Sequence, residues 1–226
     1  MEEQPTLLIG LDFSIASQEV IEVLIEDASE TGVFDEIAKA NTQRPEILKL
    51  LMEHPNTPEE VKKFIAGVLH LPAVPRKDIV KAERTREARA ESLLQKIQKL
   101  SVSARVQLAL KGGREIRGIL ARDPNKQVSL NVLENGKITE SEIEMIAKSR
   151  QTLEDALRRI AKNREWMKNY SILFALVTNP KTPPGMSIGF VSDIKTKDLV
   201  VLEKNKNVAE AVRSAAKRVL QIRKPK

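Results

Sequence analysis

The sequence contains no cysteine, few aromatic residues and only two histidines among its 226 residues. The absence of cysteine excludes disulfides, zinc–thiolate sites, iron–sulfur clusters and thiol nucleophiles. His54 and His70 have no second histidine at the spacing of a metal site. We therefore expect neither a metal nor a cofactor.

Long apolar runs are also absent. No stretch approaches the roughly 20 apolar residues that a membrane-spanning helix needs, and the start Met1-Glu2-Glu3 is unlike the basic start of a secretory signal. We expect a cytoplasmic chain with no membrane partner. No set of nucleophile, base and orienting residue can be named, and Gly112-Gly113 does not belong to a phosphate-binding motif, so we predict no catalytic residues and no enzyme.

Charge is distributed unevenly along the chain. Residues 1–75 contain 5 Lys and Arg against 14 Asp and Glu, a net charge of −9, whereas residues 76–226 contain 33 against 17, a net charge of +16. The basic part can meet an anionic partner such as nucleic acid. Alternatively, the acidic part packs on the basic part, either of the same chain or of a second copy, so self-association is a further expectation. Most of the Lys and Arg side chains are interpreted as solvated helix faces.

The spacing of apolar residues predicts an all-α fold. They recur every three or four residues, as in Val208, Ala211, Val212 and Ala215, and alternating strand patterns are scarce. Residues 76–99 have no Gly or Pro and carry no large apolar side chain between Lys81 and Ser92, which predicts a long charged helix, with a disordered linker as the alternative. We predict an acidic helical-repeat unit at 1–75, a connecting helix at 76–103 and a basic helical-repeat unit at 104–226.

A corner motif recurs in three places: LMEHPNTP at 51–58, VLENGKIT at 132–139 and LVTNPKTP at 176–183. Asn closes a helix and Pro cannot continue it, while the following Thr is expected to cap the next helix. Two capping boxes are predicted, at Thr57–Glu60 and Thr139–Glu142. The motifs are 81 and 44 residues apart, in a ratio near two, which indicates repeated helical units.

The Asn-Pro-x-Thr-Pro corner at 179–183 resembles that of leucine-rich-repeat-variant proteins, bacterial relatives of the HEAT-like and armadillo α-solenoids. The string NREWMKNY at 163–170, together with this corner, is similar to a group of uncharacterised bacterial proteins. The resemblance is strongest over 104–226. It implies an irregular α-solenoid of short helical repeats, which would act as a scaffold for a partner. Some members carry a cysteine-bound cluster, which this chain cannot.

One candidate site is aromatic. Trp166, Tyr170 and Phe174 are spaced at i, i+4 and i+8, on one side of a helix that we expect to start near Asn163. Flanked by Arg164 and Lys168, they predict an anchor for a peptide or an unstacked base. The alternative is packing between neighbouring helices.

A second candidate site is basic. Arg114 and Arg117, then Arg158, Arg159 and Arg164, recur across the predicted units and would form a stripe for phosphates. The alternative is a solvated outer face. Together, these observations predict a non-enzymatic bacterial scaffold that binds a protein or peptide partner. The alternative is a nucleic-acid-associated protein that uses the basic C-terminal part.

Overall fold

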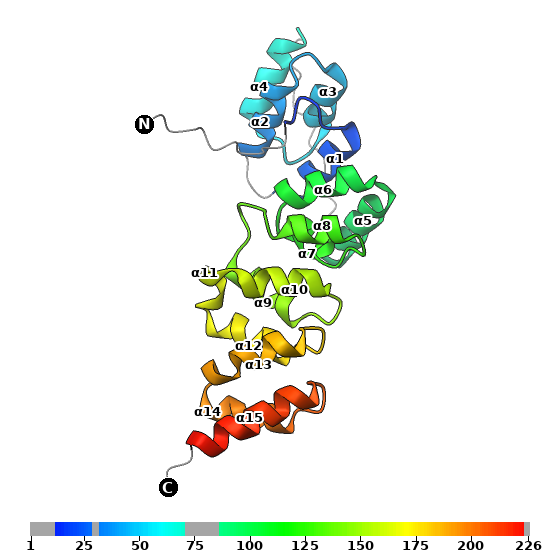
Figure 1. Ribbon diagram of the computed structural model, residues 1–226. Coiled ribbons are helices and arrows are strands. Elements are labelled where there is room, and N and C mark those ends of the chain that lie inside the picture. Colours follow the sequence, from blue (N-terminus) through cyan, green and yellow to red (C-terminus); the bar gives the residue numbers. More distant parts are fainter. Residues whose placement is uncertain (1–11, 29–31, 71–85, 224–226) are drawn as a thin grey trace, which may run out of the picture. The chain divides into compact units, whose positions relative to one another are not determined.

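The computed structural model describes residues 12–28, 32–70 and 86–223, apart from the side chains of 86–90, and every regular element in these ranges is a helix (Figure 1). The predicted all-α fold is confirmed. Packing divides the chain into two compact units, Met1–Arg117 and Gly118–Lys226, called here the first and second unit.

The helices are short, as their sequence spacing predicts. The first unit contains α1 (Gln18–Asp27), α2 (Gly32–Ala40), α3 (Pro45–Glu53), α4 (Glu59–Val68), α5 (Arg86–Lys99) and α6 (Val102–Lys111). The boundary falls within α7 (Arg114–Leu120). The second unit continues with α8 (Lys126–Val132), α9 (Glu140–Lys148), α10 (Glu154–Lys162), α11 (Arg164–Met167), α12 (Tyr170–Thr178), α13 (Pro184–Phe190), the 3-10 helix η1 (Val191–Asp193), α14 (Thr196–Lys204) and α15 (Glu210–Arg223).

The three predicted corners each lie between two helices, namely α3–α4, α8–α9 and α12–α13. Their hydrogen bonds recur at two further corners, α9–α10 and α14–α15. In each, the side chain of the first corner residue accepts a hydrogen bond from the backbone N–H two residues later, and its carbonyl accepts one from the N–H three residues later. These first residues are His54, Asn135, Ser149, Asn179 and Asn205. Short polar side chains that fold back on the backbone explain why Asn and Ser recur here.

The corner threonines do not all have the predicted capping role. Thr139 and Glu142 form the predicted capping box of α9. Thr57 does not cap α4, so the second predicted box is wrong: its buried hydroxyl donates to the Leu51 carbonyl at 2.5 Å. Thr152 bonds the Ile146 carbonyl in the same way at 2.7 Å. The hydroxyl gives a second hydrogen bond to a carbonyl at the end of the preceding helix, which already accepts the backbone N–H of the first corner residue.

The first unit is assembled on α1, which packs on α2, α3, α5 and α6. Leu93 and Ile97 of α5 are buried, and Lys96 forms an ion pair with Glu26 of α1. The described part of the predicted connecting helix therefore belongs to the first unit. It ends at Lys99, since Ser101 caps a new helix by accepting from the Ala104 N–H. Residues 76–85 of that prediction lie outside the described residues.

The compact units thus differ from the predicted parts 1–75, 76–103 and 104–226. The boundary lies at Arg117 because α5 and α6 both pack on α1, and a docked helix belongs to the core that it buries. The predicted boundaries relied on the change of net charge along the sequence. Charged side chains lie mostly on solvated faces, so they do not indicate which helices pack together.

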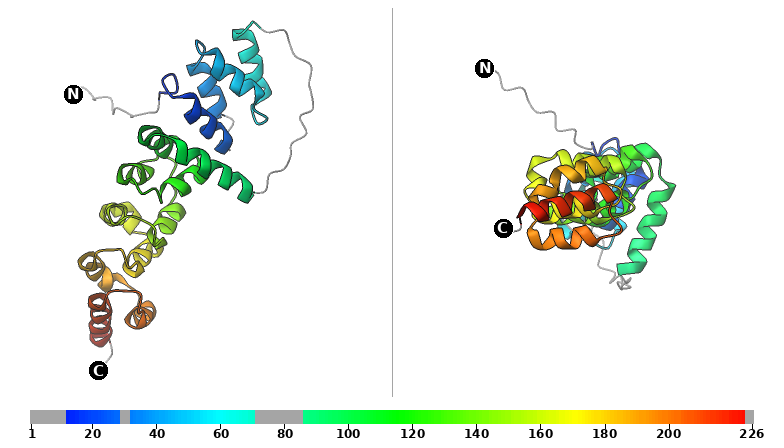
Figure 2. Two further views of the ribbon diagram at one scale, coloured as in Figure 1. Left: turned by 90° about the vertical axis from the view of Figure 1, so that its right-hand side faces the viewer. Right: turned by 60° about the horizontal axis from the view of Figure 1, so that its bottom comes forward.

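In the second unit, helices pack on others close to them in the sequence: α8 on α10, α9 on α12, α12 on α13, and α13 and α14 on α15. Figures 1 and 2 show α14 and α15 side by side at the end of this succession. A continuous core joins α12, η1, α14 and α15, formed by Leu173, Val177, Val191, Ile194, Leu199, Leu202, Val208, Val212 and Ala216. Contacts between near neighbours are typical of repeat arrays; the solenoid itself stays a prediction.

A partly buried carboxylate connects α1 with α7. Asp27, the last residue of α1, accepts a hydrogen bond from the Ile116 N–H at 3.2 Å, and a Cβ on Gly113 would lie 2.5 Å from its Oδ2. Burial raises the pKa of Asp27 to about 6, and the Glu115 carboxylate acts in the same direction. The N–H of Ile116 and the charge of Arg117 oppose this rise without cancelling it.

We expect Asp27→Asn to stabilise the protein at neutral pH. Because the folded pKa of Asp27, about 6, is above the 3.8 of an ordinary aspartate side chain, the folded state binds more protons between these values. Stability therefore falls as the pH rises through this window and is lowest above pH 6. Asparagine can still accept the Ile116 N–H, so the gain should be about 1 kcal/mol at pH 7.5 after allowance for partial solvent screening, and should disappear near pH 4.

The measurement is the free energy of urea unfolding from pH 4 to 8, followed by far-ultraviolet circular dichroism. Asp35→Asn removes a carboxylate from an exposed ion pair with Lys39 and serves as the control. Equal pH profiles for the two variants would contradict the role of Asp27.

Candidate partner-binding surface

Two of the predicted arginines lie on α7. Arg114 is exposed at the first residue of this helix. Arg117 is 6% exposed, and its Nη1 donates to the Gly112 carbonyl at 3.0 Å. The prediction that Arg117 contacts a phosphate partner is therefore wrong. Its guanidinium pairs a backbone carbonyl at the end of α6 and stabilises the fold.

Two more arginines extend from the exposed side of α10. Arg158 pairs with Glu154, one turn earlier, with 2.6 Å between Nη2 and Oε1, and its Nη1 lies 3.9 Å from the Met186 sulfur. Arg159 forms an ion pair with Glu134. Both guanidiniums are thus next to carboxylates that reduce the local positive potential. This arrangement weakens the predicted phosphate stripe within the second unit.

The predicted aromatic helix is interrupted. Trp166 lies on α11, whereas Tyr170 and Phe174 lie on α12, because Asn169 starts a new helix between them. The Oδ1 of Asn169 accepts a hydrogen bond from the Ser171 N–H at 2.9 Å, and its Nδ2 donates one to Glu140 of α9 at 2.7 Å. The prediction that Trp166, Tyr170 and Phe174 share one helix is wrong, because the spacing of apolar residues gives no sign that Asn169 caps a new helix.

Tyr170 is held by its neighbours in the fold. Its hydroxyl donates to Asp198 at 2.5 Å and accepts from the Lys195 N–H at 3.1 Å. Lys195 also places its ammonium 4.3 Å from the ring centroid, and Phe174 stacks on the ring at 6.2 Å. Burial and the hydrogen bond to Asp198 raise the pKa of the Tyr170 hydroxyl. Tyr170 therefore joins α12 to α14, as the packing alternative expects.

Trp166 is placed differently. It is partly exposed on a helix of four residues, and it is not among the side chains that pack on the core joining α12, η1, α14 and α15, which include Tyr170, Phe174 and Phe190. Asn163 fixes the start of this helix, since its Oδ1 accepts from the Glu165 N–H at 3.0 Å and the Trp166 N–H at 3.2 Å. The tryptophan is thus accessible on a backbone with a defined conformation.

The cations around Trp166 differ in their pairing. Lys168 pairs with Glu165 at 2.7 Å, and both side chains are more than two thirds exposed. Such a pair contributes little to stability or binding. Arg164 and Lys162 are exposed and form no ion pair within the described residues. The accessible set is therefore Trp166, Arg164 and Lys162, called here the Trp166 site.

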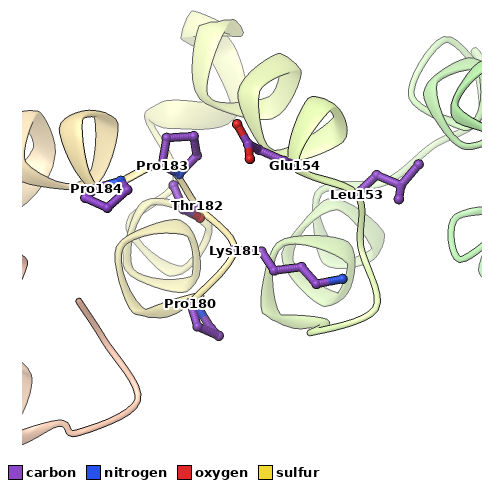
Figure 3. A pocket seen from close by; sticks show the side chains of 7 residues that line it. All are labelled: Leu153, Glu154, Pro180, Lys181, Thr182, Pro183 and Pro184. Carbon is purple, nitrogen blue, oxygen red and sulfur yellow. The ribbon is translucent and has the colours of Figure 1, made fainter.

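A shallow hollow of about 440 Å³ lies where the α12–α13 corner meets the start of α10 (Figure 3). Leu153, Glu154 and the corner segment 180–184 line it. Thr182 is 3% exposed and its hydroxyl has no hydrogen-bond partner among the residues that the structure describes, unlike Thr57 and Thr152 at the matching positions. The sequence predicts the α12–α13 corner as a joint between helices. It gives no sign of the hollow, because the hollow forms only where this corner lies against the α9–α10 corner.

A further exposed surface was not predicted. On α14, Val200 is 41% and Val201 60% exposed, whereas Leu199 and Leu202 are fully buried. The available signal was the run of four consecutive apolar residues at 199–202. A helix buries one face, so such a run must leave some of its apolar side chains outside.

Comparison of the chain with protein-family models, curated proteins and solved structures found no match. The structure shows an all-helical fold in the described residues. The resemblance to leucine-rich-repeat-variant proteins stays a prediction. Within the described residues, no three His, Asp or Glu side chains gather as a metal site would require. In the same part of the chain, no helix has both the length and the apolar character needed to cross a membrane.

Proposed function

We propose that this chain is a non-enzymatic helical-repeat scaffold whose second unit binds a protein or peptide partner through the Trp166 site. The observation that carries the proposal is the partial exposure of the chain's single tryptophan on a capped four-residue helix. Tryptophan and arginine are the residues most often found to dominate binding energy at protein interfaces. Arg164, two residues before Trp166 in the same short helix, supplies this combination.

The pairing of the other arginines supports a protein or peptide over a phosphate backbone. Phosphate binding needs several unpaired cations in a row, yet Arg158 and Arg159 pair with carboxylates and Arg117 is buried. A peptide needs one anchored apolar side chain and a few polar contacts. The Trp166 site offers both.

We expect Trp166→Ala to weaken partner binding at least tenfold, since truncation of an aromatic anchor commonly costs 2 kcal/mol or more. Arg164→Ala should weaken it several-fold. Arg122→Ala serves as the matched control, because it removes another exposed arginine of the second unit that forms no ion pair in the described part of the chain. Proteins captured from the native cell by each immobilised variant are identified by mass spectrometry, after circular dichroism has verified folding.

The proposal predicts a protein that the wild type and Arg122→Ala capture and that both site variants lose. Identical captures by all four chains would contradict it. The captured protein is then titrated against the wild type, with the fluorescence of Trp166 as the readout.

Nucleic acid is the alternative partner. It is favoured by a partly exposed indole, on which a base can stack, and by two exposed cations close to it in the sequence, Lys162 and Arg164. It predicts quenching of Trp166 by a single-stranded oligonucleotide at low salt. The logarithm of the affinity should then fall with the logarithm of the salt concentration by about 0.7 for each phosphate contacted. No quenching in 20 mM salt at micromolar concentrations would exclude this alternative.

A further inference from the structure

The outer face of α14 carries apolar and basic side chains together. Lys197 and Lys204 each lie three or four residues from both Val200 and Val201, so the four side chains share one face, and all four are exposed. Thr196 is the remaining exposed residue of this helix. Neither lysine forms an ion pair within the described residues. The four residues, called here the α14 stripe, thus hold two valines in contact with water between two positive charges.

The two carboxylates of α14 lie off this face. Asp198 is partly buried and accepts a hydrogen bond from the Tyr170 hydroxyl at 2.5 Å. Glu203 is partly buried too, and it comes one turn after the fully buried Leu199, on the side of the core. The α14 stripe therefore has a charge of two with no negative group of its own helix to offset it.

The neighbouring helix α15 has the same character where it meets the start of α14. Ile222 is 77% exposed. Its neighbour Arg223 places Nη1 at 3.3 Å from Oγ1 of Thr196, the first residue of α14. Ile222 thus lies at the end of α15 that adjoins the start of the α14 stripe, and adds a third aliphatic side chain exposed to water.

The net charge of the two helices and their connection is positive. Residues 196–223 contain 7 Lys and Arg against 3 Asp and Glu, a net charge of +4. Beyond the two carboxylates of α14, the third is Glu210, which forms an ion pair with Arg213. The sign of the α14 stripe is therefore the sign of its surroundings, and it favours an anionic partner.

We propose that the α14 stripe docks an acidic segment of a partner protein that also carries aliphatic or aromatic side chains. The carboxylates of the segment would pair with Lys197 and Lys204, and its apolar side chains would cover Val200 and Val201. This surface is additional to the Trp166 site, because it lies on another helix and needs none of that site's residues.

The valines decide against two other anionic partners. A phosphate backbone would pair with the lysines but would bring charged oxygens, and not apolar groups, against the valines. Helices that lie on a membrane surface insert large side chains such as Trp, Phe and Leu, which the α14 stripe lacks. An acidic and partly apolar protein segment matches both the charges and the valines.

The contact is expected to be weak and to depend on salt. With 9 residues, α14 is about 13 Å long. One face of such a helix buries less surface than the roughly 800 Å² per partner of a standard interface. Its ionic part should be screened as the Debye length falls from about 10 Å at 0.1 M salt to about 3 Å at 1 M.

The test begins with a library of random peptides of about 12 residues, displayed on phage and selected on the full chain at low salt. Peptides that bind the variant Lys197→Glu with Lys204→Glu are removed beforehand. The proposal predicts that the peptides retained by the wild type are rich in Asp and Glu and contain Leu, Ile or Phe. No enrichment, or enrichment of peptides without acidic residues, would overturn it.

One selected peptide, labelled with fluorescein, is then titrated with each variant, and its anisotropy gives the dissociation constant. Lys197→Glu with Lys204→Glu should weaken binding at least tenfold. Val200→Ser with Val201→Ser leaves the net charge unchanged and should weaken binding several-fold. Circular dichroism verifies the folding of each variant. Full binding by the serine variant would overturn the assignment of the valines to the contact.

Two controls separate the α14 stripe from net charge and from the Trp166 site. Lys181→Glu with Arg122→Glu makes the same change in net charge at exposed positions outside the stripe, and should have a smaller effect than the stripe lysines. Trp166→Ala should bind the peptide within about twofold of the wild type, so either proposed surface can fail without the other. Equal effects of the two charge reversals, or loss of binding in Trp166→Ala, would overturn the proposal.

The same titration tests the other two anionic partners, with a labelled oligothymidylate and with vesicles that contain phosphatidylserine. The proposal expects each to bind at least tenfold more weakly than the selected peptide. Tighter binding of either one by the wild type, lost in the variant with both stripe lysines reversed, would overturn it in favour of that partner.

Discussion

Gly112→Ala is expected to destabilise the protein by about 3 kcal/mol and to lower the melting temperature by about 10 °C or more. A Cβ at this position would lie 2.6 Å from the Leu108 carbonyl oxygen and 2.5 Å from Cγ2 of Ile116. Neither neighbour can move away easily, because Leu108 is helical backbone and Ile116 is fully buried. The backbone of Gly112, with φ −62° and ψ 155°, is open to any residue, so the whole effect comes from this contact.

Gly118→Ala is the matched control, because a Cβ there has nothing within 4 Å. Gly118 lies inside α7, where alanine is the better helix former, so we expect a gain of about 0.5–1 kcal/mol. The measurement is thermal unfolding by calorimetry and far-ultraviolet circular dichroism. Equal melting temperatures for the two variants would show that the α6–α7 junction can relax, in conflict with the close packing described.

Asn179→Ala is expected to cost the second unit about 3 kcal/mol. Asn179 is 4% exposed, and its Nδ2 donates to the carbonyls of Ala147 at 2.6 Å and Ser149 at 3.0 Å. Its Oδ1 accepts from the Lys181 N–H at 2.9 Å. The amide thus connects the α12–α13 corner to the α9–α10 corner. Its removal takes this donor from the buried Ala147 carbonyl and leaves the Ser149 carbonyl with the Thr152 N–H alone. An unpaired buried carbonyl costs about 1–3 kcal/mol.

Asn205→Ala is the control for this variant. Asn205 has the same position in its own corner and accepts from the Asn207 N–H at 3.0 Å, but within the described residues it bonds to no second corner. We expect a cost of about 1 kcal/mol or less. Urea unfolding followed by Trp166 fluorescence measures both. If the two variants lose the same stability, the bonds between corners contribute nothing measurable.

The corners could be predicted from the sequence because their chemistry is local. An asparagine or serine that accepts a backbone N–H two residues later acts within its own corner, and so it leaves a sequence pattern. The direction of the threonine hydroxyl could not be predicted, because capping the next helix and bonding the preceding one use the same residue type. Thr57 and Thr139 show both outcomes.

Features that depend on distant residues were beyond the sequence. Arg117 has the spacing of a surface cation, yet it is buried against the end of α6. The charged α5 was expected to connect two units, yet it docks on α1 through Leu93, Ile97 and the pair Lys96–Glu26. Of the predicted site residues, Arg114 and Arg164 are exposed and Trp166 is partly exposed, and none of the three forms an ion pair within the described residues. The structure places Tyr170 in contacts with α14 that no spacing on its own helix could indicate.

The placement of Trp166 and Tyr170, the chain's single tryptophan and single tyrosine, has a consequence for spectroscopy. Both lie in the second unit, so the absorbance at 280 nm and almost all of the near-ultraviolet signal originate there. The first unit could lose its structure without changing either signal, whereas far-ultraviolet circular dichroism would detect the loss. Denaturation curves from the two spectral regions would therefore separate if the two halves melt independently, and coincide if they melt together.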